Sequence, residues 1–152
     1  MQYRGHMVPR RRYLIYARDY PGEEPELVLM HGFPDDFHLY DRLVPRLSSR
    51  WIMVFDFLGW LRADKPEGCP YTADNQGRDL DAVIWPLGLE DGVLVAHDAS
   101  GPTAIDWALA HADRPAALVL LNTCYRRTLA TRPPAATFLF STPVLGDVAH
   151  VA

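Results

Sequence analysis

The sequence predicts an α/β protein built on a mostly parallel, doubly wound sheet. Four short, almost continuously apolar runs are separated by stretches with helical character, and strands that are buried on both faces have this composition. The runs span residues 27–30, 51–55, 93–96 and 117–121. Strands that alternate with helices imply right-handed crossovers, and therefore helices on the faces of one sheet.

The intervening stretches are expected to be helices at residues 40–47, 72–87 and 102–110. Thr72 can cap the second of them, and Pro86 with Gly88 can end it. Pro102 falls in the first turn of the third helix, where its missing N–H costs little. Ahead of these elements, residues 13–17 are typical of an antiparallel edge strand, and residues 3–8 are a candidate for another strand.

The composition fits one globular domain and argues against several classes of partner. The chain has 152 residues, of which 49% are hydrophobic and 22% charged, and its net charge is −4. Acidic and basic residues are interspersed, so we expect no nucleic-acid surface. Cys69 and Cys124 are too few and too far apart for a disulfide framework or a metal site. We expect a cytoplasmic protein without membrane span, metal or cofactor, since no apolar run could cross a bilayer and the N-terminus lacks a signal-peptide core.

The segment from Val93 to Gly101 carries the strongest indication of chemistry. An apolar run meets Asp98, which has the small residues Ala96 and Ser100 two positions away on each side. This pattern predicts a tight turn from strand to helix with Asp98 at its apex, where the carboxylate can attack carbon and form an ester. Two alternatives remain open: Asp98 only caps the helix, or Ser100 is the nucleophile of a serine esterase.

The loop His31-Gly32-Phe33-Pro34 follows the run at residues 27–30 and is expected to face the same site. An oxyanion hole in this arrangement uses the backbone N–H after the nucleophile and one N–H from the earlier loop. Ala99 and Phe33 are therefore the expected donors. The alternative is that the loop is simply a tight turn at the end of a strand.

Together these segments resemble the α/β-hydrolase superfamily, specifically its aspartate-nucleophile branch of epoxide hydrolases and haloalkane dehalogenases. The resemblance runs from about residue 13 to residue 123 and also includes Phe55-Asp56-Phe57-Leu58-Gly59-Trp60. It implies hydrolysis of a small organic substrate through an aspartyl ester on Asp98. It also implies that His31 and His97 are structural and support the site together with Gly32 and Pro34.

Departures from the family pattern refine this expectation. Dehalogenases of this kind place tryptophan after the nucleophile and asparagine or glutamate in the first loop, where this chain has Ala99 and Phe33. An epoxide is therefore the preferred substrate and an alkyl halide the next. The family's usual second glycine after the fourth strand is replaced by Leu61, which would be strained if that position requires a positive φ.

The resemblance covers only the first half of the family's fold. Residues 1–123 correspond to the N-terminal part of the hydrolase core, and residues 124–152 to the start of a cap or a disordered tail. The family's cap, last strands, catalytic histidine and acid partner have no counterpart, and His150 is a poor candidate for the base. The rival interpretation is thus an inactive truncated fragment or interaction module. We also expect self-association through an exposed edge at residues 117–121.

Overall fold

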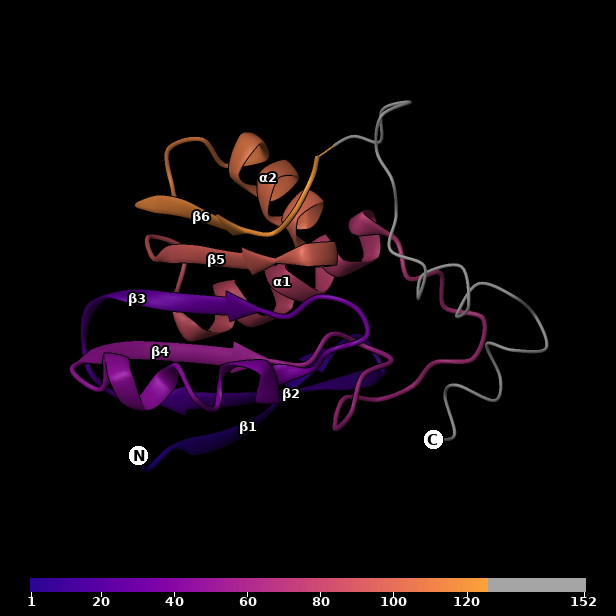
Figure 1. Cartoon of the computed structure of the whole chain (residues 1–152). Helices are drawn as coiled ribbons and strands as arrows, with labels where there is room; N and C mark the ends of the chain where they lie inside the picture. The colour runs from indigo at the N-terminus through magenta and orange to yellow at the C-terminus, as the bar shows by residue number, and fades with distance from the viewer. Residues whose placement is uncertain (126–152) are drawn as a thin grey trace.

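A computed structural model describes residues 1–125 as one six-stranded sheet with helices packed against it (Figure 1). The order of the strands across the sheet is β1-β2-β4-β3-β5-β6. The strands are β1 (Arg4–Arg10), β2 (Tyr13–Tyr20), β3 (Glu23–Met30), β4 (Arg50–Phe55), β5 (Val93–His97) and β6 (Ala117–Leu121).

The four apolar runs form the parallel part of this sheet, as the sequence predicts. β3 pairs in parallel with both β4 and β5, and β5 pairs in parallel with β6. β1 and β2 form an antiparallel hairpin, and β2 joins the sheet by antiparallel pairing with β4. The edge strand on this side is therefore β1, and not the strand that contains residues 13–17.

Two α-helices lie where the sequence predicts them. α1 (Ala73–Leu87) begins after Thr72, whose side chain accepts a hydrogen bond from the Asn75 N–H, and ends at Gly88 with a φ of 66°. α2 (Gly101–Ala110) carries its proline in the first turn. The wide hydrophobic face of α1 packs on the same side of the sheet as α2 and contributes Leu80, Val83 and Ile84 to the core.

The expected helix at residues 40–47 is wrong. Two short 3₁₀ turns occupy this region, η1 (Phe37–Tyr40) and η2 (Val44–Leu47). Pro45 stands in the first turn of η2, where it cannot donate to a preceding turn, so a continuous helix from residue 40 is interrupted. Phe37, Tyr40 and Val44 are buried against the other face of the sheet.

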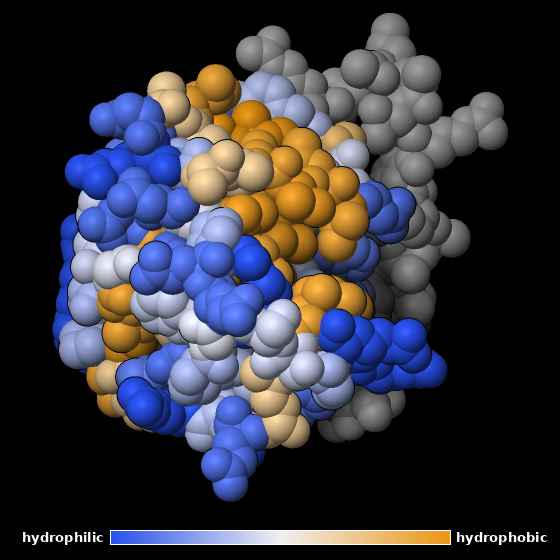
Figure 2. All heavy atoms as spheres, turned by 90° about the vertical axis from the view of Figure 1, so that its left-hand side faces the viewer, coloured by the Kyte–Doolittle hydropathy of each residue, from blue (hydrophilic) through white to orange (hydrophobic). Residues whose placement is uncertain are grey.

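The far edge of the sheet is formed by β6, whose outer side pairs with no described strand. Val119, Leu120 and Leu121 remain 39%, 43% and 39% exposed. Figure 2 shows apolar surface gathered at the height of β5, β6 and α2 on the face to the left of Figure 1. An apolar strand with unpaired backbone groups is a template for further strand pairing.

We therefore propose that this edge mediates self-association, and we expect sedimentation velocity to show species larger than a monomer that increase with concentration. Val119→Lys places a charge on the edge strand and should shift the distribution toward monomer. Leu109→Lys places the same charge on α2, at an apolar residue that is more exposed than Val119, and as the control it should leave the distribution unchanged. A concentration-independent monomer in the unmodified chain would contradict the proposal.

No helix of the described residues is long and apolar enough to cross a membrane. The predicted second region, residues 124–152, lies almost wholly outside the described residues, as does His150.

Candidate active site

Asp98 lies where β5 ends and the chain turns into α2. Residues 98–100 form a single 3₁₀ turn, η3 (Asp98–Ser100), and Asp98 has a φ of 50°. A non-glycine residue with positive φ is uncommon and is held in place only by its surroundings. The predicted strand-to-helix turn with Asp98 at its apex is thus confirmed, whereas the role of Asp98 as nucleophile remains a prediction.

The hydroxyl of Ser100 ties this turn to the sheet. Ser100 is fully buried, and its Oγ accepts a hydrogen bond from the His97 N–H at 3.0 Å. The same hydroxyl lies 2.9 Å from the carbonyl oxygen of His97 and 3.1 Å from that of Met30, to which it can donate. These contacts bind the start of the turn to the end of β3. The small residue predicted at this position is therefore an internal brace.

Thr123 braces the same turn from the other side. It follows β6, and its hydroxyl donates to the carbonyl oxygen of Asp98 at 2.5 Å. Gly101 permits this approach, because a Cβ atom at that position would collide with the Thr123 side chain. The unusual backbone of Asp98 is thus fixed by contacts to β3 and to the segment after β6.

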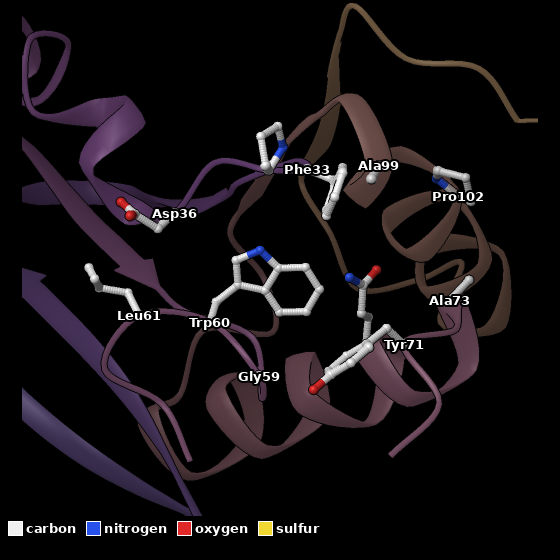
Figure 3. Close-up of a pocket in the computed structure, with 11 residues that line it drawn as sticks. Phe33, Asp36, Gly59, Trp60, Leu61, Tyr71, Ala73, Ala99 and Pro102 are labelled. Atoms are coloured by element: carbon white, nitrogen blue, oxygen red, sulfur yellow. The ribbon is translucent and has the colours of Figure 1, made fainter. Parts of the chain in front are cut away.

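The first loop reaches the Asp98 carboxylate through Gly32 and Phe33. The Phe33 N–H donates to Asp98 Oδ2 at 3.1 Å. A Cβ atom on Gly32 would lie 2.5 Å from Asp98 Cβ and 2.9 Å from the His97 carbonyl oxygen, so only glycine allows the loop this close. Figure 3 shows Phe33 and Ala99 next to each other at one wall of the pocket.

Ala99, the second expected donor, is exposed and lines the pocket with Phe33 and Pro34. The structure thus brings the expected nucleophile and the two expected donor residues into one neighbourhood. The Phe33 N–H makes contact with the carboxylate in this state. The joint action of Phe33 and Ala99 as an oxyanion hole stays a prediction.

The pocket beside this turn has a volume of about 730 Å³. Its other walls come from the loop after β4, which carries Trp60, and from the chain that enters α1, which carries Tyr71. The rings of Trp60 and Tyr71 meet edge to face with their centres 5.2 Å apart (Figure 3). Gly59 has a φ of 96°, and a side chain there would overlap the Tyr71 ring. The aromatic wall therefore depends on this glycine.

The expected strain at Leu61 is wrong. The positive φ values of the described residues fall on Arg11, Asp98, Asn122 and three glycines, and Leu61 is not among them. Gly59 takes the left-handed conformation in this loop instead. Leu61 is 45% exposed at the rim of the pocket, so its side chain meets no obstacle.

His31 is held at both ring nitrogens, whereas its expected role as a structural residue stays a prediction. Its side chain is buried, with Nδ1 2.8 Å from the Gly32 carbonyl oxygen and Nε2 3.4 Å from the Phe57 N–H. Both contacts are satisfied when Nδ1 carries the proton and Nε2 accepts. Burial lowers the pKa of His31, which favours this neutral form. With both nitrogens engaged, His31 is not available as a base.

Asp56 organises the loops behind the pocket and was not expected from the sequence. It is fully buried, and its two carboxylate oxygens accept hydrogen bonds from the Phe37 N–H and the Arg62 N–H, each at 3.1 Å. Desolvation by burial raises its pKa to about 6. Its position in the sequence directly after β4 could have indicated this role, because ligand sites in such sheets lie at the carboxyl ends of the parallel strands.

The raised pKa predicts a pH dependence of stability. An unfolded aspartate has its ordinary lower pKa, so the folded chain binds the Asp56 proton more readily. The resulting stabilisation is present at low pH and is lost as the pH rises through about 6. Relative to Asp56→Asn, the free energy of unfolding should increase by about 1 kcal/mol when the pH falls from 7 to 5. Urea unfolding of both proteins at the two pH values measures this. The prediction would be contradicted if the unfolding free energy of the unmodified chain, minus that of Asp56→Asn, were unchanged or lower at pH 5 than at pH 7.

Comparisons with known proteins agree with the fold. The sequence matches the family described as alpha/beta hydrolase fold over residues 25–145. It is 34% identical over 106 residues to a fluoroacetate dehalogenase from Burkholderia sp, an alignment that covers 66% of this chain and 35% of the relative.

Two solved structures show the same fold. The haloalkane dehalogenase DatA from Agrobacterium tumefaciens C58 superposes with a TM-score of 0.82 at 24% identity, over 96% of this chain and 51% of the dehalogenase. The epoxide hydrolase VrEH1 from Vigna radiata superposes with a TM-score of 0.77 at 23% identity, over 98% of this chain and 52% of the hydrolase. The chain thus spans about half the length of these solved structures, and the alignment to the curated relative covers about a third of it.

Proposed function

Because the chain belongs to the alpha/beta hydrolase fold family, we propose that it acts in the hydrolysis of a small organic substrate through an ester on Asp98. An epoxide is the preferred substrate and an alkyl halide the next. The observation that carries this proposal is the hydrogen bond from the Phe33 N–H to Asp98 Oδ2 at a turn with a φ of 50°.

This hydrogen bond gives the two carboxylate oxygens different tasks. Oδ2 is held by the loop, so Oδ1 is the oxygen left to attack. Its electron pair forms a C–O bond to a ring carbon of the epoxide, the ring C–O bond breaks, and the released alkoxide takes a proton from water. The product is an ester whose carbonyl oxygen is Oδ2, already next to the Phe33 N–H.

The same donor then stabilises hydrolysis of the ester. Water attacks the ester carbonyl carbon and loses a proton, negative charge develops on Oδ2, and a preorganised N–H aimed at that oxygen lowers the barrier. The bond from this carbon to Oδ1 then breaks, and the product alcohol leaves with Oδ1 and takes up the proton, which regenerates the carboxyl group of Asp98. Ala99 is proposed as the second donor. The base that removes a proton from water is not assigned to a described residue, because His31 has both ring nitrogens engaged.

Helix capping alone does not account for Asp98. A capping carboxylate accepts hydrogen bonds from the N–H groups of its own helix, whereas the contact made by Asp98 comes from Phe33, 65 residues earlier. The serine esterase alternative is disfavoured as well. Ser100 is 0% exposed, and its hydroxyl is engaged with His97 and Met30. A substrate carbon could reach it only if these contacts broke.

The test uses two probes and the intact mass of the protein. A variant with Cys69→Ser and Cys124→Ser removes the thiols, which also react with epoxides. Because no described residue is assigned as the base of the second step, the ester should persist, and styrene oxide should add one mole per mole of this chain both with and without the substitution Ser100→Ala. p-Nitrophenyl acetate is a probe of reactive serines. The amount of acetyl group that it transfers to the chain should be the same with and without the substitution Ser100→Ala. No adduct with the epoxide would favour the rival of an inactive or purely interacting chain, and a Ser100-dependent acetyl group would favour the esterase.

A further inference from the structure

Gln76 is a buried polar side chain that faces the candidate pocket. It lies in the first turns of α1, is 9% exposed, and lines the pocket together with Ala73 and Tyr71. A primary amide in such a place costs free energy unless its donors and acceptor find partners. Its partners therefore decide what the pocket can bind.

The acceptor half of this amide is already engaged. The hydroxyl of Thr103, on α2 and 1% exposed, donates to Gln76 Oε1 at 3.1 Å. With the oxygen held by α2, the amide nitrogen is on the opposite side of the group. Within residues 1–125 this Nε2 makes no hydrogen bond. Thr103 thus orients Gln76 so that a donor is left for a ligand.

The negative charge on the described lining of the pocket disfavours anionic ligands. Asp36 is the one ionised side chain among these lining residues, and no lysine, arginine or histidine accompanies it. The Asp98 carboxylate adds a second negative charge at the adjacent wall. Two carboxylates would repel an anionic substrate, and no cationic side chain of the described lining would pair with it. The remaining surface is largely aromatic and apolar, contributed by Phe33, Trp60 and Tyr71.

We propose that Gln76 determines specificity by donating a hydrogen bond from Nε2 to an acceptor oxygen of a neutral substrate, and that the pocket discriminates against carboxylates. Carboxamides, esters and ketones carry such an oxygen. This inference rests on the proposed function, because it names the substrate class of the same site. Asp98 supplies the reacting oxygen and Gln76 holds a group that does not react.

The test is a titration of the isotope-labelled chain, observed by NMR through the side-chain NH₂ signals of Gln76. Gln76→Met identifies these signals by their disappearance. Butyramide and butyrate are the probes, since they match in size and differ in charge. Butyramide should shift the Gln76 signals in a saturable way, and butyrate should bind at least about tenfold more weakly. Equal or tighter binding of butyrate, or Gln76 signals that do not move with butyramide, would overturn the proposal.

Three further variants separate a role in specificity from a general structural role. Thr103→Val removes the hydroxyl that orients the amide without changing the pocket lining, and it should weaken butyramide binding about threefold to tenfold. Thr103→Ser keeps the hydroxyl and should retain the binding. Asp36→Asn removes a negative charge and should improve butyrate binding alone. Loss of binding in Thr103→Ser as well, or improvement of both probes in Asp36→Asn, would contradict the assignment.

The outcome is distinguishable from a failure of the proposed function. Butyramide and butyrate do not react, so their binding is independent of ester formation on Asp98. A chain that binds butyramide through Gln76 but forms no ester with styrene oxide would refute the aspartyl mechanism only. A chain that forms the ester but shows no preference for butyramide would refute the role of Gln76 only.

Discussion

Replacing Asp98 by asparagine is expected to abolish ester formation with an epoxide while leaving the free energy of unfolding nearly unchanged. An amide oxygen is a poor nucleophile, so the rate of adduct formation should fall by at least about a thousandfold. Asparagine tolerates positive φ better than most residues and still offers an oxygen to the Phe33 N–H. The unfolding free energy should therefore change by no more than about 0.5 kcal/mol.

Mass spectrometry of the adduct and urea unfolding of the same samples measure the two quantities. Asp35→Asn, at a carboxylate in the loop that leads from β3 to η1, is the matched control and should keep the rate of adduct formation. An unchanged rate in Asp98→Asn would mean that another group attacks. A large loss of stability would mean that the carboxylate is mainly structural.

Replacing Gly32 by alanine is expected to have the second large effect, on stability and reactivity together. The new Cβ would lie 2.5 Å from Asp98 Cβ and 2.8 Å from Oδ2, so the loop must move away from the turn. Overpacking of this kind costs about 1–3 kcal/mol of stability. The displaced Phe33 N–H would also release Oδ2, so Oδ1 would no longer be held in the orientation for attack, and the rate of adduct formation should fall at least about tenfold.

Gly77→Ala is the control for this substitution. It lies inside α1, and a Cβ atom there meets nothing within 4 Å, so alanine should stabilise the helix by about 1 kcal/mol. Gly32→Ala with wild-type stability and wild-type reactivity would show that the loop does not need to approach Asp98 as closely as the structure has it.

The sequence was sufficient to predict the four parallel strands and the turn at Asp98, because both depend on local patterns. A buried parallel strand needs a continuous apolar run, and a tight turn into a helix needs small residues around its apex. These patterns are present in residues 93–101 and remain readable without any knowledge of the rest of the fold.

What the sequence could not show depends on contacts between distant segments. Thr123 reaches the Asp98 carbonyl oxygen from 25 residues away, and Thr103 orients Gln76 across the two helices. Neither contact can be predicted from the local pattern of hydrophobic residues. The 3₁₀ turns at residues 37–47 were missed for a different reason, since Tyr40, Val44 and Leu47, within the expected helix, repeat with a spacing that fits an α-helix equally well.

The most direct measurement for this account is the identity of the residue that carries the substrate after one reaction. The unmodified chain is incubated with styrene oxide, digested, and its peptides are sequenced by tandem mass spectrometry. The account predicts that the added mass lies on Asp98 and that it is absent from the same peptide of Asp98→Asn. An adduct on Ser100, or adducts confined to Cys69 and Cys124, would contradict the assignment of Asp98 as the nucleophile.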